Sequence, residues 1–529
     1  MKKIYLNGNF ITLEEGMIEA VLVEDKKISK VGKEEEILIY KDKETKIVDL
    51  KGRTMMPSFI DAHSHFFGVA NSFMQISLEE CSNIAEIKEK LKEFKQNNKI
   101  DNSKWIIANN YDYTNLEEKR NIKKEEIDEI IKDNPVVIQN KSGHSGVFNS
   151  KGLEILGINN KTTMSFEGNI EKLNGELTGL LEEKAFIENI KKVPMPSKEE
   201  IIESCIEAQK EYLSYGITTV QEGMFVKELV PIYKELLKEN ILKVNLVAYL
   251  DIKSKNEIRK AFKGHINKYN KNFKIGGYKI FLDGSPQLRT AWMRTSYLGE
   301  ESYYGYSAME DKEVENAIQI AANDNMQILA HCNGDRAAEQ YIDAIRNIDE
   351  DEKEQIKNPV MIHAQFLGID QLEEVKKYEI IPSFFISHIY YWGDTHIKNF
   401  GIERTKNISP AKSALKQNIL YTFHQDSPVV KPNMFHTIWC AVKRETKNGE
   451  KLNDDERISV IDAIKAVTIN AAKQYGEEDL KGSIKEGKLA NLIIVDKNPL
   501  GIEIDKLKEI QILETIKEGE ILYKDIHNI

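Results

Sequence analysis

The sequence lacks most features of a secreted or membrane protein. Its 529 residues include only four cysteines, which are widely separated and form no CxxC pair. We therefore expect buried thiols in a reducing compartment rather than a disulfide framework. No stretch approaches the roughly 20 consecutive apolar residues that a membrane span needs. The amino terminus reaches polar residues before the apolar region of a signal peptide could form, so we expect a cytoplasmic protein without a membrane partner.

An excess of positive charge is also absent. The formal net charge is −11, whereas nucleic-acid binding usually needs a basic surface that neutralises phosphates. We therefore expect no nucleic-acid partner. Hydrophobic residues make up 41% of the chain, and its length exceeds what one core usually contains. Together these values predict a large barrel with an accessory domain.

Both ends of the chain are rich in short strand-like runs separated by turn residues. Examples are Lys3–Leu6 and Ala20–Val23 near the start and Leu492–Asp496 near the end. Two strand-rich ends around a long α/β middle predict that residues 1–55 and 480–529 together form one small β-sandwich domain.

The middle, residues 56–479, alternates apolar strand-like runs with helical patterns, which is typical of parallel βα units. Eight such runs predict a (β/α)8 TIM barrel, whose active site lies at the carboxyl ends of its strands. They are Pro57–His65, Gly216–Glu222, Lys243–Leu250, Gly277–Gly284, Met326–Gly334, Pro359–Gln365, Ile380–His388 and Ile419–Asp426. Residues 66–215 exceed the length of one helical connection, so we expect a large insertion after strand one, with its own strand at Pro135–Gln139.

The first predicted barrel strand ends in an HxH motif. His63 and His65 are two residues apart, so their imidazoles lie on the same face of the strand. Imidazole is a favoured ligand of zinc, iron, copper and nickel. On this motif alone, a pair of ordinary histidines is an equal alternative.

Other predicted strand ends carry the same chemistry. His331 and His363 each follow an apolar run, and Asp426 ends the last one. Packing alone favours valine or isoleucine inside a barrel, so clustering at strand ends indicates a metal site. Of the 11 histidines in the chain, six lie at predicted strand ends, namely His63, His65, His331, His363, His388 and His424.

These residues, in this order, resemble the amidohydrolase superfamily. Within it they resemble the amidohydrolase-3 branch, which includes N-substituted formamide deformylases and YtcJ-like metal-dependent hydrolases. The resemblance covers essentially the whole chain, and it rests on the HSH motif together with Lys279–Ser285, His331–Asp335, Ile362–Gln365 and His424–Pro428. One departure concerns strand two, which ends in Gln221-Glu222 where relatives often have His-Asp; it affects the substrate pocket and leaves the metal set intact.

The resemblance implies a binuclear metal centre. His63 and His65 would bind one divalent ion, His331 and His363 a second, and Asp426 would contact metal and hydroxide. Lys279 would be carboxylated by CO₂ and bridge the ions, which we expect to be two zinc ions, with manganese or iron as alternatives. A cationic ammonium would be repelled by two divalent ions, whereas a carbamate is an anionic oxygen ligand. A lysine paired with Asp283 or Glu222 and a mononuclear site remain open.

Such a centre predicts hydrolysis of a small molecule. A metal acidifies water to supply hydroxide and polarises a carbonyl, while Asp426 acts as general base and then as general acid. We expect cleavage of a C–N bond of an amide or formamide. Alternatives on the same barrel are a deaminase, a lactonase or a carbamate hydrolase, and from another class a catalytically silent ligand-binding protein. Symmetric homo-oligomers are common among soluble proteins, so a homodimer is one assembly open to this chain.

Several further residues are candidates for contacts with the substrate. His388 could stabilise a tetrahedral oxyanion, Tyr391 and Trp392 could form an aromatic wall, His144 could bind the substrate carbonyl, and Arg294 a carboxylate. The alternatives are an ordinary hydrogen bond, simple packing and a solvent-facing arginine. A further histidine, two residues before Asp426, is a candidate for orienting a metal ligand: His424.

Overall fold

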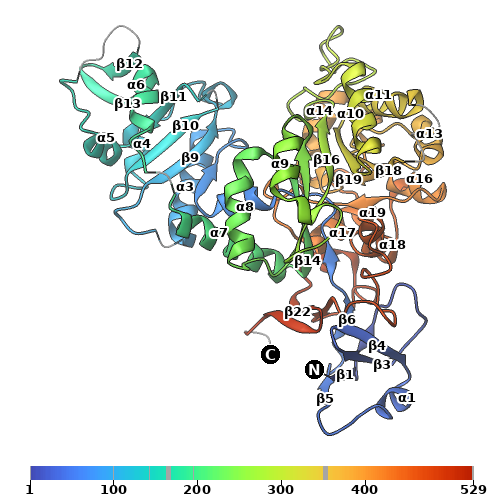
Figure 1. Cartoon of the computed structure of the whole chain (residues 1–529). Coiled ribbons are helices and arrows are strands. Elements are labelled where there is room, and N and C mark those ends of the chain that lie inside the picture. The colour runs from blue at the N-terminus through green and yellow to red at the C-terminus, as the bar shows by residue number, and fades with distance from the viewer. Residues whose placement is uncertain are drawn as a thin grey trace. The chain divides into compact units, whose positions relative to one another are not determined.

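The computed structural model describes residues 2–98, 100–141, 143–162, 168–194, 196–348 and 355–526 (Figure 1). The chain divides into two units. The first comprises Met1–Phe66 and Gln209–Ile529, and the second comprises Phe67–Ala208. The second unit lies within the segment 66–215, which the sequence predicts as an insertion.

An eight-stranded, all-parallel sheet forms the centre of the first unit. Beyond its strands, the His65 amide donates to the Ser427 carbonyl at 2.8 Å, and the Asp426 amide donates to the His63 carbonyl at 3.2 Å. These bonds link the first strand to the last, so the fold is TIM-barrel-like, as the sequence predicts. The strands, neighbours in chain order, are β7 (Phe59–Ile60), β14 (Ile217–Phe225), β15 (Asn245–Asp251), β16 (Phe273–Phe281), β17 (Gln327–Cys332), β18 (Lys357–His363), β19 (Ile381–Phe384) and β20 (Thr422–Phe423).

Helices connect successive strands of this sheet. Helix α10 shows why they form, because its buried residues Val314, Ala317, Ile318 and Ala321 recur at helical spacing. The connecting helices are α7 (Lys198–Ser214) before β14, then α8 (Val230–Lys238), α9 (Lys255–Ala261), α10 (Asp311–Asn323), α11 (Asp335–Asn347), α13 (Leu372–Lys377), α14 (His388–Phe400), α15 (Ile402–Thr405) and α16 (Ala411–Lys416). Helices α17 (Met434–Lys443), α18 (Val460–Ala466) and α19 (Ile469–Gln474) follow the last strand, β20.

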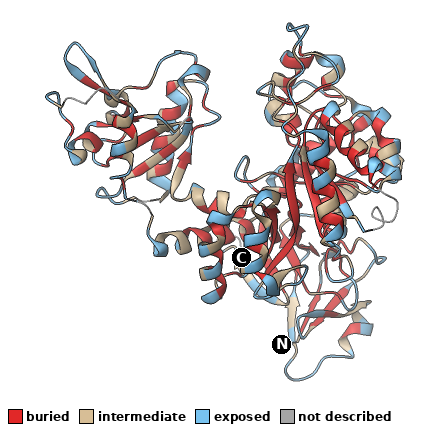
Figure 2. Cartoon of the chain, turned by 45° about the horizontal axis from the view of Figure 1, so that its top comes forward, coloured by how far each residue is buried: buried red, intermediate tan, exposed pale blue. Residues whose placement is uncertain are grey.

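The barrel strands are buried along nearly their whole length (Figure 2). This explains their continuous apolar sequences, since both faces of each strand are covered. Side chains from several strands meet in one cluster inside the barrel, which includes Ile60, Val247, Tyr249, Leu329, Val360 and Ile362.

The seventh strand ends earlier than the sequence predicts. Strand β19 ends at Phe384, and His388 is the first residue of helix α14 instead of the last of a strand. The physical reason is the spacing of the buried residues Ile389, Gly393, His396 and Phe400, which is helical and outweighs the apolar run before it.

Strands from both ends of the chain form two further sheets. Strand β6 pairs with β21 in antiparallel fashion and thereby joins the beginning of the chain to its end. Buried residues of both sheets, among them Tyr5, Val21, Met55 and Leu492, belong to one hydrophobic cluster. The first sheet has the order β4 (Lys27–Gly32), β3 (Ala20–Glu24), β1 (Lys3–Leu6), β5 (Lys46–Asp49), and the second β2 (Asn9–Phe10), β6 (Thr54–Pro57), β21 (Leu492–Val495), β22 (Ile512–Lys517), β23 (Glu520–Lys524).

The second unit contains a six-stranded mixed sheet. Helix α3 (Ile84–Asn98) contributes Ile87 and Leu91 to a core shared with Ile106 and Val136 of the sheet. The strand order is β12 (Gly168–Leu173), β13 (Glu176–Glu183), β11 (Ser145–Phe148), β10 (Val136–Asn140), β9 (Ile106–Tyr111), β8 (Gln75–Ser77).

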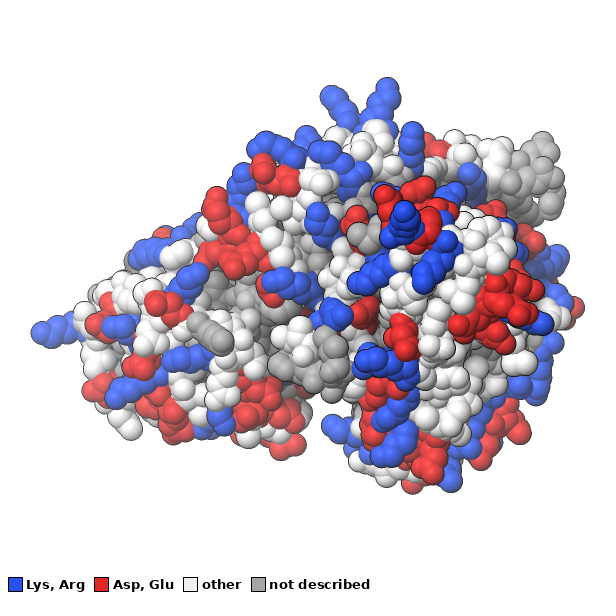
Figure 3. Space-filling model, turned by 90° about the horizontal axis from the view of Figure 1, so that it is seen from below, with Lys and Arg blue, Asp and Glu red and all other residues white. Residues whose placement is uncertain are grey.

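Two properties of the described residues concern the membrane and nucleic-acid partners that the sequence leads us not to expect. Among the helices of the described residues, none has both the length and the apolar character needed to cross a membrane. The face drawn in Figure 3 carries acidic side chains interspersed among its lysines and arginines.

A buried charge cluster lies at the amino ends of the barrel strands, opposite the catalytic face of such folds. Glu477 forms ion pairs with Lys274, near the start of β16, and with Lys481, the latter at 2.7 Å. All three residues are nearly inaccessible to solvent. Burial alone would raise the pKa of Glu477, but Lys481 and Lys274 lower it to about 2.

Substitution of Glu477 by glutamine is expected to lower the free energy of unfolding by about 3–5 kcal/mol, because two buried lysines lose their counter-charge. Since the pKa of Glu477 is lower in the folded protein, this contribution is fully present above its ordinary value of 4.5 and is lost as the pH falls toward about 2. Urea unfolding at several pH values measures it. The exposed Asp479→Asn variant should change stability by less than about 0.5 kcal/mol, and an equal loss in both variants would contradict this role.

Candidate metal centre

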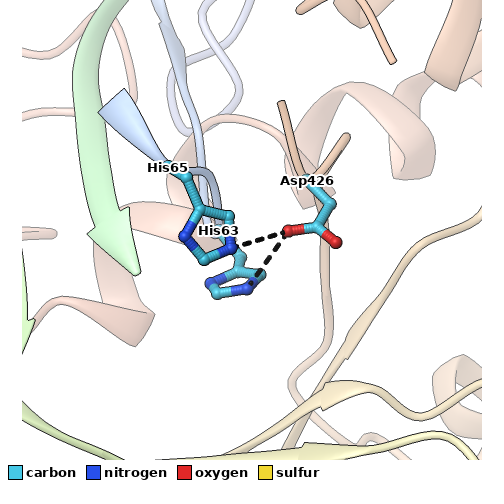
Figure 4. Close-up of side chains that lie close together, drawn as sticks. All are labelled: His63, His65 and Asp426. Atoms are coloured by element: carbon cyan, nitrogen blue, oxygen red, sulfur yellow. Dashed lines mark ion pairs between the residues drawn. The ribbon is translucent and has the colours of Figure 1, made fainter. Parts of the chain in front are cut away.

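The candidate ligands come from different strands and meet at the carboxyl end of the barrel. His63 and His65 follow β7, and Asp426 follows β20. Figure 4 shows the three side chains directed toward one another. Asp426 Oδ1 lies 3.4 Å from His63 Nε2 and 3.2 Å from His65 Nε2. One ligand atom from each residue lies within 4.8 Å of the others, a grouping that could hold a metal ion.

Lys279 reaches the same point from β16. Its Nζ lies 3.4 Å from His63 Nε2, and the residue is 1% exposed. Burial lowers the pKa of this amine to about 7, although Asp426 acts in the opposite direction. Of the two carboxylates that the sequence offers as alternative partners of Lys279, Asp283 accepts backbone hydrogen bonds and Glu222 accepts one from the Tyr233 hydroxyl.

His331 and His363 form the other side of the centre. His331 Nδ1 lies 3.1 Å from His363 Nε2, and the latter lies 3.9 Å from Asp426 Oδ2. The second nitrogen of His331 faces the Gly284 carbonyl at 3.1 Å. When Nε2 of His331 carries the ring proton and donates it to this carbonyl, Nδ1 is unprotonated and directs its lone pair toward the centre.

A left-handed backbone conformation at His363 directs its side chain into the site. Val360 and Ile362 of β18 face the barrel interior, so strict alternation would direct His363 to the opposite face. His363 instead has a φ of 73°, and Asp426 has a φ of 56°. Strained positions of this kind persist where the surrounding structure fixes them, and they concentrate at functional sites.

A second histidine supports His363 from behind. His424 Nε2 lies 3.2 Å from His363 Nδ1, and Ser383 Oγ lies 2.9 Å from His424 Nδ1. His424 is fully buried. It contacts a candidate ligand, and its role in orienting that ligand stays a prediction.

Gln221 orients His63 and was missed as a functional residue. Its Nε2 donates to the Ala62 carbonyl and the Tyr475 hydroxyl, both at 2.9 Å, so its Oε1 faces His63 Nδ1 at 2.5 Å. His63 then carries its proton on Nδ1, and Nε2 presents a lone pair to the centre. The only sequence signal for Gln221 is its position at the end of predicted strand two, where the departure from relatives indicates a changed substrate pocket and not a residue that orients a metal ligand.

Substitution of Gln221 by methionine is expected to weaken metal binding about 10–100-fold, because His63 loses the acceptor that selects its tautomer. Competition with a chelator measures the affinity. The exposed Gln96→Met serves as the matched control. Equal affinities of Gln221→Met and the control would show that Gln221 does not orient the ligand.

Asp283 fixes the loops around His331 and was also missed. Its carboxylate accepts hydrogen bonds from the backbone amides of Asn333 at 2.9 Å, Gly334 at 2.7 Å and Trp292 at 3.0 Å. It therefore joins the segments that follow β16 and β17. The sequence gives no direct signal for this role, because the partners are backbone groups.

The remaining predicted residues are placed as follows. The ring of His388 packs against Trp392 at a centroid distance of 4.4 Å, and Tyr391 is 40% exposed beside it. Arg294 forms a bidentate ion pair with Asp370, so its guanidinium is already engaged within the protein. His144 belongs to the second unit, where its Nδ1 lies 3.1 Å from Oε2 of Glu183. Their substrate roles stay predictions.

Known proteins are similar to this chain over nearly its whole length. Residues 46–523 match the model described as Amidohydrolase family. YtcJ of Bacillus subtilis (strain 168) is 28% identical over 544 residues, covering 99% of this chain and 100% of that protein. N-substituted formamide deformylase of Arthrobacter pascens is 24% identical, covering 98% of each. Among solved structures, an uncharacterized metal-dependent hydrolase from Pyrococcus horikoshii OT3 has a TM-score of 0.73 and 25% identity, covering 96% of this chain and 99% of that chain.

Proposed function

This chain belongs to the amidohydrolase family, and we propose that it is a metal-dependent hydrolase that cleaves a C–N bond of a small amide or formamide. The observation that carries the proposal is the convergence of six potential ligands from the ends of five strands. They are His63, His65, Lys279, His331, His363 and Asp426.

The donor chemistry of the site fits a cation. Because Gln221 holds the proton of His63 on Nδ1, the Nε2 lone pair of His63 faces an oxygen of Asp426 at 3.4 Å. Two acceptors at this distance repel each other unless a positive charge lies between them. Imidazole and carboxylate together are ligands of zinc and related divalent ions.

We assign the ligands to two ions. His63, His65 and Asp426 would hold one, His331 and His363 the other, and Lys279 would bridge them as a carbamate. When bound, such ions acidify water and polarise a carbonyl. Zinc is the ion we propose, with manganese and iron as alternatives.

The surroundings of Lys279 favour its carboxylation. Burial lowers the pKa of the amine to about 7, so a substantial fraction is neutral near physiological pH. The neutral nitrogen can attack the carbon of CO₂, forming an N–C bond and releasing one proton. The product is a carbamate whose negative charge suits a position between cations.

Asp426 would move the proton during hydrolysis. As general base it accepts a proton from the attacking water, and as general acid it delivers that proton to the leaving nitrogen. Burial alone would raise the pKa of Asp426, but its interactions with His65, His363 and His63 hold it well below its usual range, so the carboxylate is ionised and able to accept a proton. The products would be an amine and a carboxylate.

The test is turnover by protein reconstituted with zinc, manganese or iron. N-substituted formamides, simple amides, a lactone, a carbamate and an aminopyrimidine are supplied separately, and release of amine, acid or ammonia is measured. Amine release from formamides or amides, absent from His63→Ala, supports the proposal. Turnover of the lactone or the aminopyrimidine alone would reassign the scissile bond, and an inert metal-loaded protein would leave a ligand-binding role.

A further inference from the structure

Two buried histidines of helix α14 contact each other. Nδ1 of His388 lies 3.1 Å from Nε2 of His396, and the two ring planes are inclined by 9°. Their exposed fractions are 4% and 0%. His396 belongs to none of the ligand groups described above, so its burial in this position needs a separate explanation.

His388 is the member of the pair that lies toward the metal centre. Its ring packs against Phe385 at a centroid distance of 4.6 Å, and Phe385 in turn contacts the ring of His363 at 6.1 Å. A charge on His388 would also interact with Asp426. His388 therefore lies next to the ligand cluster, and His396 lies behind it.

Only one proton can lie between the two facing nitrogens. If His388 donated it, His396 would accept at Nε2 and, as a neutral ring, would carry its own proton on Nδ1. That Nδ1 is buried and has no hydrogen-bond partner among the described residues. A buried N–H without an acceptor is rare and costly in proteins.

The reverse arrangement avoids this cost. If His396 donates from Nε2, its Nδ1 keeps only a lone pair, and a buried acceptor without a partner is better tolerated than a buried donor. Neither ring gains a charge, because burial lowers the pKa of His396 to about 3 and that of His388 well below its ordinary value. His388 then accepts at Nδ1 and carries its proton on Nε2.

We propose that His396 is a positioning residue that holds His388 in the Nε2–H tautomer, so that His388 donates a hydrogen bond to the substrate carbonyl oxygen. The inference rests on the proposed hydrolase function. A fixed donor at this oxygen stabilises the negative charge that develops on it in the tetrahedral intermediate. With Nδ1 engaged and Nε2 protonated, His388 cannot serve as a base, and that role is left to Asp426.

Nitrogen NMR tests the tautomer without turnover. Protein labelled with ¹⁵N in its histidine rings is examined at neutral pH, and the signals of His388 are assigned by their loss in His388→Gln. We expect Nε2 of His388 to have the shift of a protonated ring nitrogen and Nδ1 that of an unprotonated one. The opposite pattern would overturn the inference even if amide hydrolysis is found.

Substitutions at position 396 provide the second test. Glutamine can donate a hydrogen bond to Nδ1 of His388, whereas methionine of similar length cannot. With a formamide that the wild type hydrolyses, we expect His396→Met to lower kcat about 10-fold or more with little change in KM, and His396→Gln to restore most of the loss. The ¹⁵N pattern of His388 should survive only in His396→Gln. Equal kcat values for both variants, or unchanged ¹⁵N shifts in His396→Met, would overturn the positioning role.

Discussion

Substitution of Asp426 by asparagine is expected to lower kcat for amide hydrolysis about 10²–10⁴-fold, which is the usual contribution of a general acid–base residue. Asparagine keeps a carbonyl oxygen that can contact metal, but it can neither accept the proton of the attacking water nor deliver it to the leaving nitrogen. The loss should therefore appear mainly in kcat, with metal content largely retained.

Steady-state kinetics and elemental analysis of the same preparation separate these effects. The exposed Glu403→Gln is the matched control and should retain wild-type kinetics. Wild-type kcat in Asp426→Asn would exclude Asp426 as the proton carrier. Loss of metal in proportion to activity would show that its carboxylate acts only as a ligand.

Substitution of Lys279 by methionine is expected to remove most of the bound metal and to lower kcat/KM by at least about 10³-fold, because both ions lose their shared anionic ligand. Lys279→Glu restores a carboxylate at the same position and should bind more metal than Lys279→Met. The exposed Lys263→Met serves as the control for loss of a lysine charge.

The carbamate itself can be observed directly. Apoprotein reconstituted with metal and ¹³C-labelled bicarbonate should give a carbamate carbon signal that is absent from Lys279→Met. Reconstitution in CO₂-free buffer should recover less activity. A Lys279→Met protein with full metal content and activity would rule out the bridging role.

The barrel was predictable because its two signals are local in sequence. A continuous apolar run marks a strand that is buried on both faces, and helical spacing marks the connection that follows. The same local signals failed at His388, where an apolar run passes directly into helix α14. The β-sandwich arrangement of the two terminal sheets stays a prediction.

The candidate ligands were predictable because they occupy strand ends, and parallel strands bring their carboxyl ends together. The supporting residues were not, since their roles depend on contacts between distant parts of the chain. Gln221 faces a histidine 158 positions earlier, and Asp283 accepts from amides about fifty positions later. His396 is separated from His388 by only eight positions, yet its proposed role depends on a ring nitrogen without a hydrogen-bond partner among the described residues, which no sequence pattern reveals.

The metal content of the purified protein tests the central claim most directly. Elemental analysis by mass spectrometry compares the wild type with His63→Ala. The account predicts about two equivalents of zinc, manganese or iron in the wild type, as in two-metal hydrolytic sites, and a marked fall in the variant. A metal-free wild type that stays inert after metal is added back would contradict it.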